Sequence, residues 1–378
     1  MLQRNRRSAT TLGLSAVALA GALSLTACAG DDNKTGTTTA NGSAATGGTP
    51  SVTCGKGGTL LGAGSTAQAN AMDLWKTTYS AACPGTTINY SGGGSGAGIQ
   101  QFTQGKVQFA GSDYVLKPAD VEASKAVCTG GKAIGLPMVG GLVSLVYNIN
   151  GVDNLVLDGP TAAKIFNSQI TKWNDPAIAA LNPGTKLPDA EIQSFHRSDD
   201  SGTTYNLTSY FAKTSGGAWP AAPDKAWKGT GGQSANGSAG VSAQIKQVDN
   251  SIGYVELSYA QINNLKSAKI STGAAQPVEA TAANAANTFA TSTVVGTEGD
   301  LALSLDYGTK ADNAYPIVLV TYEVVCDKGN KPDSLDTLKS FFTYTISDDA
   351  QKAIGDKGYV PLPGTISSQV KTAVTTLA

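Results

Sequence analysis

A polar loop in the middle of the chain reads Phe195-His196-Arg197-Ser198-Asp199-Asp200-Ser201-Gly202-Thr203-Thr204. Apolar residues then recur from Tyr205 to Phe211 at a spacing typical of a helix. Asp200 or Ser201 can cap this helix, so that its first backbone N–H groups point into the loop without partners. The planar guanidinium of Arg197 suits a tetrahedral oxyanion, and the helix dipole favours an anion at the same place. The loop therefore predicts one half of an anion-binding site.

Two earlier loops share this design. Strands are expected at 58–62, 87–90 and 107–111, and helices between them, which is typical of a parallel sheet with ligands at the carboxyl ends of its strands. The first two loops contain Gly64-Ser65-Thr66 and Gly94-Ser95-Gly96, and Asp113 follows the third strand. Glycine and serine often serve only to turn the chain, but these loops together with Arg197 indicate an anion site.

Asp113 suits such a site only if the anion carries a proton. An ionised carboxylate accepts hydrogen bonds and donates none. It can accept the proton of phosphate, but it repels sulfate, which is fully ionised, so Asp113 can select between two oxyanions of similar size. Two simpler roles for Asp113 are a helix N-cap and a partner for Lys117.

Length and composition set the class of protein. The 378 residues are enough for one large domain or two of ordinary size, and 41% hydrophobic residues support a core. The formal net charge is −1, and loss of Arg4, Arg6 and Arg7 would make it about −4, because 24 basic residues then face 28 acidic ones. The basic footprint of a nucleic-acid-binding protein is absent, so we expect no nucleic-acid partner.

The first 27 residues predict a signal peptide. Three arginines precede an apolar stretch from Thr11 to Leu25, which is too short to span a membrane comfortably. Leu25-Thr26-Ala27-Cys28 resembles the lipobox of bacterial lipoproteins, which implies cleavage before Cys28 and its diacylation, with palmitate as an expected acyl group. An ordinary signal peptide with an incidental cysteine is the alternative. Residues 28–53 are expected to be the lipidated N-terminus and a flexible tether, because Thr, Gly, Ala, Asn and Ser dominate them.

The remaining cysteines are four, an even number in a chain predicted to be exported. Two disulfides are expected among Cys54, Cys83, Cys128 and Cys326, and their number alone leaves three connectivities open. We expect no metal and no cofactor, since there is no CxxC motif and His196 is the only histidine.

Two stretches of the sequence resemble enzyme motifs, but their surroundings do not fit the corresponding enzymes. Gly92-x-Gly94-x-x-Ala97 resembles a dinucleotide-binding fingerprint, but the strand–helix order breaks after Asp113. A serine hydrolase would need His196 as its base, and the sequence has no GxSxG motif.

Long apolar stretches later in the chain indicate connections between two lobes. Residues 134–147 can cross from one lobe to the other, and the β-branched stretch 316–325 can return. Between 213 and 240 the chain is rich in Gly, Ser, Ala and Pro, which predicts a surface excursion with Trp219 and Trp227 as its large anchors.

In this combination, the motifs resemble those of the PstS family, the phosphate-binding proteins of bacterial ABC phosphate transporters. The resemblance extends from about Gly58 to the C-terminus. Besides the loops already quoted, it includes Lys172-Trp173-Asn174-Asp175-Pro176, Ser251-Ile252-Gly253-Tyr254-Val255-Glu256 and Gly358-Tyr359-Val360-Pro361-Leu362-Pro363.

The resemblance implies a set of phosphate-binding residues: Thr66, Ala67, Ser95, Asp113, Arg197, Ser201, Gly202 and Thr203. Asp199 matches the aspartate that orients the arginine. Ala67 stands where the family often has phenylalanine, and its contact with phosphate would be through the backbone N–H.

The resemblance also implies the fold: an α/β, periplasmic-binding-protein-like architecture with two lobes, a hinge of crossing strands and a ligand cleft between the lobes. Lobe one would hold residues 54–139 and 322–378, and lobe two residues 140–321. Phosphate could then contact both halves of the site only when the cleft closes.

The implied function is high-affinity binding of inorganic phosphate and its delivery to the permease subunits of an ABC transporter. We expect a monomer that is no enzyme and is held by the lipid on Cys28 at the extracytoplasmic face of the cell membrane. The alternatives are an exported, phosphatase-like enzyme that binds phosphate esters and a surface adhesion module.

The order of strands and helices selects one cysteine pairing. Cys54 precedes the first strand, and Cys83 ends the helix that returns to the start of that strand. Cys128 precedes the outgoing crossing strand, and Cys326 ends the returning one. We therefore expect the disulfides Cys54–Cys83 and Cys128–Cys326.

Overall fold

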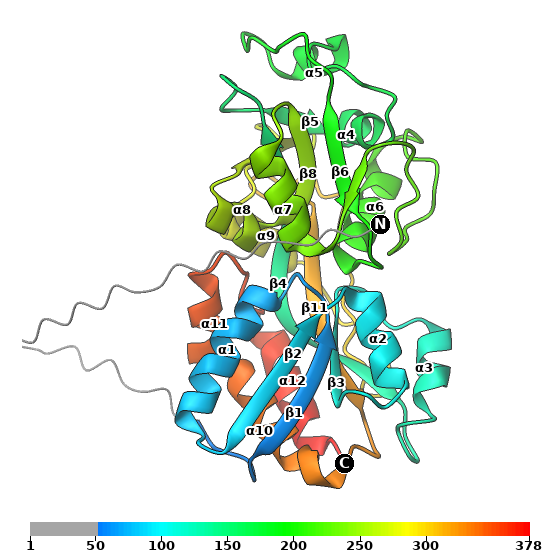
Figure 1. Ribbon diagram of the computed structural model, residues 1–378, viewed down its shortest axis with the longest axis vertical. Helices are drawn as coiled ribbons and strands as arrows, with labels where there is room; N and C mark the ends of the chain where they lie inside the picture. Colours follow the sequence, from blue (N-terminus) through cyan, green and yellow to red (C-terminus); the bar gives the residue numbers. More distant parts are fainter. Residues whose placement is uncertain (1–51) are drawn as a thin grey trace, which may run out of the picture. The chain divides into compact units, whose positions relative to one another are not determined.

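A computed structural model describes residues 52–378, so the predicted signal peptide, Cys28 and the tether up to residue 51 lie outside the described part. The described residues form a mixed nine-stranded sheet with the strand order β2-β1-β3-β11-β4-β8-β6-β7, in which β9 also pairs with β4. Helices cover it in two groups, which we call lobe one (lower in Figure 1) and lobe two (upper). The α/β fold with two lobes is confirmed.

Lobe one is built on three parallel strands. The strand pairs β1–β2 and β1–β3 are parallel, and the helices between the three strands lie where the sequence predicts them. A further helix, α3, follows β3. The elements of this part are β1 (Gly58–Gly64), α1 (Ala69–Ala82), β2 (Thr86–Gly92), α2 (Ser95–Thr103), β3 (Phe109–Ser112) and α3 (Pro118–Ser124). One face of α1 is buried through Ala71, Met72, Trp75 and Tyr79, which fixes the helix on the sheet.

Two long antiparallel strands connect the lobes (Figure 1). They are β4 (Ala133–Asn148) and β11 (Val318–Cys326), and nearly all of their residues are buried. In lobe one β11 pairs with β3 through residues 322–324, and in lobe two β4 pairs with β8 from Val143 onward. The register of β11 on β4 shifts between Thr321 and Tyr322, at the point where the ladder passes between the lobes.

Lobe two repeats the use of parallel strands, with β6 pairing in parallel with both β7 and β8. Its elements are β5 (Val156–Asp158), α4 (Gly159–Phe166), α5 (Pro176–Leu181), β6 (Gln193–Arg197), α6 (Gly202–Thr214), β7 (Gln233–Ala235), α7 (Gly237–Gln247), β8 (Ser251–Glu256), α8 (Leu257–Asn263), β9 (Lys266–Ser267), β10 (Lys269–Ser271) and α9 (Ala282–Phe289). A second, two-stranded sheet pairs β5 with β10.

The predicted excursion at 213–240 is anchored by aromatic stacking. Trp227 stacks on the ring of His196, with a centroid distance of 4.8 Å, and lies 5.0 Å from Trp219. The end of this segment is not on the surface, however, because Ala235 and Ser238 are buried. The expectation of a surface excursion is therefore wrong for its last residues.

The chain ends in lobe one with three helices, α10 (Pro332–Thr345), α11 (Asp348–Gly355) and α12 (Gly364–Thr376). Between α11 and α12, the backbone of Val360 forms a bridge with Gly140 of β4, with N–O distances of 2.9 and 3.1 Å. A Cβ atom on Gly140 would lie 2.5 Å from the Val360 carbonyl oxygen, so this approach requires glycine.

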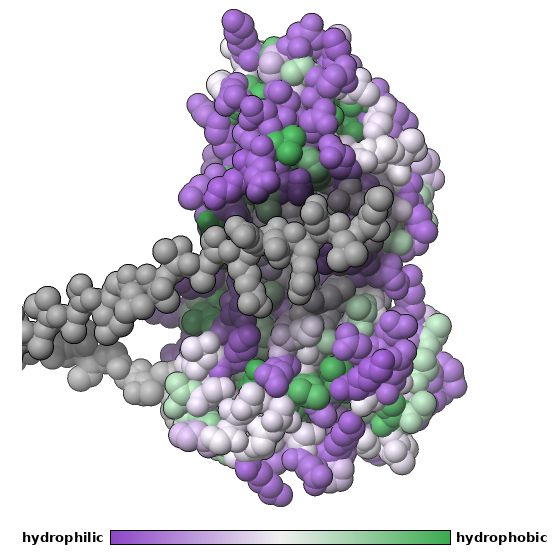
Figure 2. All heavy atoms as spheres, viewed as in Figure 1, coloured by the Kyte–Doolittle hydropathy of each residue, from purple (hydrophilic) through white to green (hydrophobic). Residues whose placement is uncertain are grey.

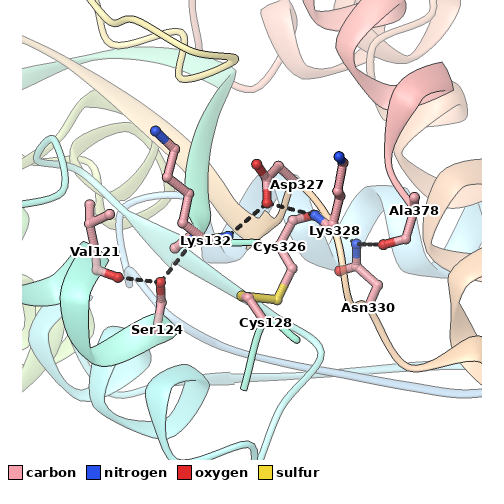
Figure 3. Close-up of a disulfide and its surroundings, with 10 residues drawn as sticks. Val121, Ser124, Cys128, Lys132, Cys326, Asp327, Lys328, Asn330 and Ala378 are labelled. Atoms are coloured by element: carbon pink, nitrogen blue, oxygen red, sulfur yellow. Dashed lines mark hydrogen bonds between the residues drawn. A yellow bond between two sulfur atoms is a disulfide. The ribbon is translucent and has the colours of Figure 1, made fainter. Parts of the chain in front are cut away.

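Both predicted disulfides, Cys54–Cys83 and Cys128–Cys326, are confirmed. The second joins the chain before β4 to the last residue of β11 (Figure 3). Asp327 stabilises the same corner, because its Oδ1 accepts hydrogen bonds from the backbone N–H groups of Lys132 and Lys328, each at 2.7 Å. The lobe-one ends of the two crossing strands are therefore tied together.

Few large hydrophobic side chains are exposed on the described part of the surface. Hydrophilic residues cover most of the visible face of lobe two (Figure 2). The large hydrophobic side chains exposed among residues 52–378 are Val115, Ile262 and Val295, which lie on three different segments. In the same part of the chain, no helix has both the length and the apolar character needed to span a membrane.

Candidate functional site

The predicted loops meet where the two lobes face each other. Thr66 of lobe one shares a hydrogen bond of 3.0 Å with Ser238 of lobe two, between their hydroxyl oxygens. Gly202 is so close to lobe one that a Cβ on it would lie 2.4 Å from Cβ of Asp113 and 2.6 Å from Oγ of Ser95. The structure thus brings the two predicted halves of the site into contact.

Backbone geometry supports this meeting. Ser201 is the N-cap of α6 and accepts a hydrogen bond from the Thr204 N–H at 3.2 Å, which decides between the two predicted caps. Helix α2 begins at Ser95, directly after Gly94, whose φ of 88° favours glycine. The Gly96 N–H donates to the Asp200 carbonyl across the lobes at 3.0 Å. Two helix N-termini, with their partial positive charge, therefore lie at one place.

Asp113 is buried directly after β3 and accepts hydrogen bonds from hydroxyls on three different segments of the chain. Ser65 reaches both of its carboxylate oxygens at 2.6 and 2.7 Å, Thr321 donates at 2.6 Å, and Ser95 donates at 3.1 Å. Burial raises the pKa of Asp113 to about 6, against the lowering effect of these hydroxyls. Neither simpler role applies, because Lys117 itself is the N-cap of α3 and Asp113 has hydroxyl partners.

Arg197 lies at the end of β6, is 2% exposed, and forms a two-point contact with the carboxylate of Asp199. Its Nε donates to Oδ1 at 2.8 Å and its Nη2 to Oδ2 at 2.5 Å. Burial acts to raise the pKa of Asp199, but the hydrogen bonds and charge of Arg197 outweigh it, so that this pKa lies below its ordinary value. Asp199 therefore has the orienting contact that was predicted for it.

The second terminal nitrogen of Arg197 points to two hydroxyls. Nη1 donates to Oγ of Ser238 at 3.1 Å and to Oγ1 of Thr203 at 3.2 Å. Thr203 in turn donates to Oε1 of Glu256 at 2.5 Å. The hydroxyl proton of Thr203 is thus directed to Glu256 in this structure.

Other predicted residues also have partners within the protein. The Ala67 N–H, expected to face the anion, donates to Oγ of Ser65 at 3.0 Å. Ser95 accepts from the Asp113 N–H at 3.1 Å while donating to the carboxylate of the same residue. The structure places these residues at the site, and their contact with an anion remains a prediction.

Sequence reasoning missed several residues that the structure places here: Ser65, Ser238, Glu256 and Thr321. Two of them carried a signal, because Ser65 and Glu256 stand inside quoted motifs. Ser238 lies in the low-complexity segment and Thr321 in a β-branched strand, so neither could be recognised locally.

The arrangement can hold a small oxyanion. Arg197 supplies a buried cation, helix termini and hydroxyls supply neutral donors, and Asp113 supplies an acceptor for one proton. Residues 52–378 contain no cluster of His, Cys, Asp and Glu suited to a metal ion.

Comparisons with known proteins agree with this geometry. A family model described as a PBP superfamily domain matches residues 35–349. The chain is 44% identical over 367 residues to phosphate-binding protein PstS 3 of Mycobacterium tuberculosis (strain ATCC 25618 / H37Rv), covering 96% of this chain and 97% of that protein. It is 40% identical over 363 residues to phosphate-binding protein PstS 2 of the same strain, covering 95% and 96%.

A solved structure shows the same fold. The phosphate-binding protein from Stenotrophomonas maltophilia superimposes with a TM-score of 0.67 at 18% identity, covering 83% of this chain and 93% of that one. Two α/β lobes with polar loops meeting between them define a solute-binding protein of the periplasmic type. Within that class, the chain belongs to the PstS family of phosphate-binding proteins.

Proposed function

We propose that this protein binds inorganic phosphate between its lobes and delivers it to the permease of an ABC transporter. The observation that carries the proposal is the pairing of Arg197 with Asp199 on lobe two, opposite the buried carboxylate of Asp113 on lobe one. One cation fixed by a carboxylate, facing a carboxylate that can accept a proton, matches a protonated oxyanion.

Selection against sulfate follows from Asp113. Three hydroxyls donate to its two oxygens, which leaves the carboxylate able to accept one more proton but unable to donate while ionised. Phosphate carries such a proton at neutral pH and sulfate does not. A sulfate ion at the same place would face an uncompensated negative charge.

Closing of the lobes is the signal for the permease in this proposal. Contacts from Thr66 to Ser238 and from Gly96 to Asp200 exist only when the lobes meet, so phosphate and closure stabilise each other. The lipid on Cys28 would keep the protein at the extracytoplasmic face of the membrane, supported by the lipobox-like sequence Leu25-Thr26-Ala27-Cys28.

Binding of radiolabelled phosphate to the purified protein, with sulfate as competitor, tests the function. We expect saturable phosphate binding that excess sulfate does not displace. The same sample should release no phosphate from p-nitrophenyl phosphate, and release would favour the phosphatase-like alternative. Absence of any phosphate binding would contradict the proposal. Replacing Cys28 with alanine should move the protein out of the membrane fraction, which tests the anchor separately.

A further inference from the structure

A third carboxyl group lies behind the site and has no assigned role. Glu323 of β11 is 1% exposed, and within residues 52–378 neither of its oxygens has a hydrogen-bond partner. The side-chain oxygen Oε1 of the buried Gln68 also has no partner there. An unpaired buried carboxylate is costly, so the state of Glu323 needs a physical explanation.

The strand register places Glu323 beside Gln68. Glu323 is paired with Gly111 of β3 in the antiparallel ladder, and directly paired residues project to the same face of a sheet. A Cβ on Gly111 would lie 2.3 Å from Nε2 of Gln68 and 2.4 Å from the hydroxyl of Tyr90. The missing side chain of Gly111 therefore makes room for the amide and the phenol on the face that carries the Glu323 carboxyl.

Hydrogen-bond direction then decides which end of the Gln68 amide faces Tyr90. The carbonyl of the fully buried Ser65 accepts from the Tyr90 hydroxyl at 2.9 Å. Tyr90 has only one hydroxyl proton, so it must accept in its contact with Gln68, and Nε2 of Gln68 donates to it at 3.0 Å. The amide oxygen of Gln68 is thereby left facing away from Tyr90, without a donor.

A neutral carboxylic acid at Glu323 gives each of the two groups a partner, because its one O–H can donate to the Gln68 oxygen, and it removes the buried negative charge. We propose that Glu323 is protonated in the folded protein and donates to Gln68, so that the chain Glu323–Gln68–Tyr90 fixes the Ser65 carbonyl. Ser65 in turn donates to both oxygens of Asp113. Glu323 is then a positioning residue for the phosphate site, and this role, unlike its protonation, rests on the proposed function.

Charge supports the neutral form. The titratable groups next to Glu323 are Asp113 at the end of β3 and Tyr90 on β2. Burial is the main cause that raises the pKa of Glu323 to about 8. The amide of Gln68 beside it acts to lower this pKa, and the negative charge of Asp113 raises it, so that burial prevails. An ionised Glu323 would place a second negative charge beside Asp113 and beside the bound anion, which would weaken phosphate binding.

The protonation state can be measured directly by infrared spectroscopy of the full chain at about pH 7, where ordinary glutamates are ionised. We expect a C=O stretching band of a buried neutral carboxylic acid in the wild type that Glu323→Gln removes. Absence of this band, or its persistence in Glu323→Gln, would overturn the proposed protonation. This measurement needs no phosphate, so it stands even if the proposed function fails.

The positioning role is tested by phosphate titration of two variants. Glutamine can donate an amide N–H to Gln68, and leucine has a similar size but no donor. We expect Glu323→Gln to bind within about threefold of the wild type, and Glu323→Leu about tenfold more weakly, as for one lost hydrogen bond. Wild-type affinity should fall between about pH 7 and about pH 9, and Glu323→Gln should lack the part of this fall that Glu323 causes.

Three results would overturn the positioning role. They are equal losses in both variants, no loss in Glu323→Leu, and identical pH profiles for the wild type and Glu323→Gln. If Glu323→Leu does not fold, the comparison of pH profiles still decides.

Discussion

Replacing Arg197 with lysine keeps a positive charge in the site but removes the planar fork. The guanidinium carries five N–H donors. Four of them have partners in the structure, two on Asp199 and one each on Thr203 and Ser238. A lysine ammonium has three N–H groups, so it cannot serve these four partners, and it must release another to contact phosphate.

The magnitude follows from this count. Only the partner that the ammonium must release on contacting phosphate weakens binding, because the first loss is present with and without phosphate. A hydrogen bond that involves a charged group is worth about 1.5–3 kcal/mol. Arg197→Lys should therefore bind phosphate roughly 10- to 150-fold more weakly than the wild type. Arg197→Met removes the charge as well and leaves a buried anion unpaired. The binding free energy of phosphate should then fall by about 3–5 kcal/mol, the range for breaking a buried ion pair.

Isothermal titration calorimetry with phosphate at constant salt measures the three affinities, and chemical denaturation without phosphate measures stability. Lys225→Met is a matched control, because Lys225 pairs with Asp200 at the same cleft but both side chains are partly exposed, at 28% and 47%. Such pairs contribute about 0–1 kcal/mol. We expect Arg197→Met also to lower the unfolding free energy, since Asp199 loses its partner at 8% exposure.

Two results would refute this reasoning. Equal phosphate affinities in the wild type and Arg197→Met would mean that the anion binds elsewhere. A loss in Lys225→Met as large as that in Arg197→Met would mean that overall charge, and not the fixed guanidinium, holds the anion.

Other changes test the remaining parts of the site and fold. Gly202→Ala places a Cβ 2.4 Å from that of Asp113. Calorimetry should therefore show phosphate binding at least about tenfold weaker, with the stability of the ligand-free protein little changed. Unchanged affinity would mean that the lobes need not approach so closely. Asp113→Asn should cost phosphate about 1.5–3 kcal/mol and admit sulfate as a competitor, and continued exclusion of sulfate would show that another group selects. The raised pKa values of Asp113, about 6, and Glu323, about 8, mean that the folded state binds more protons than the unfolded one between the ordinary and raised values. Denaturation curves should therefore show stability falling as pH rises, up to about pH 6 through Asp113 and up to about pH 8 through Glu323, by at most about 1.4 kcal/mol per pH unit for each group within its own range. A flat profile would contradict these assignments. Replacing Cys128 and Cys326 with serine removes a crosslink between residues 198 positions apart. The unfolding free energy should fall by about 2–5 kcal/mol relative to the wild type under the same oxidising conditions. Equal stability would argue against this bond.

Local sequence was sufficient for much of lobe one and for the Arg197 loop. The alternation of apolar strands with glycine turns predicts β1, β2 and β3, because each strand lies between clear turn signals. Ser201 could be proposed as a cap, because capping depends on residues only a few positions apart.

Contacts between distant segments could not be predicted in this way. Ser238 lies among glycines and alanines that resemble a surface loop, and only the pairing of β7 with β6 brings it to Arg197. Similarly, residues 300–301 belong to the stretch assigned to lobe two, yet Leu301 donates to the Gly135 carbonyl at the lobe-one end of β4. Such positions depend on strand order and register, which short-range patterns do not contain.

The disulfide Cys128–Cys326 limits how the lobes can move. It fastens the last residue of β11 to the chain just before β4, and from there the two strands stay paired up to Leu142 and Val318. The bridge from Val360 to Gly140 holds β4 to lobe one almost as far. One crossing strand therefore cannot slide along the other at their lobe-one ends. The opening that the proposed function requires would then be a rotation of lobe two, with the crossing strands bending and twisting beyond Gly140.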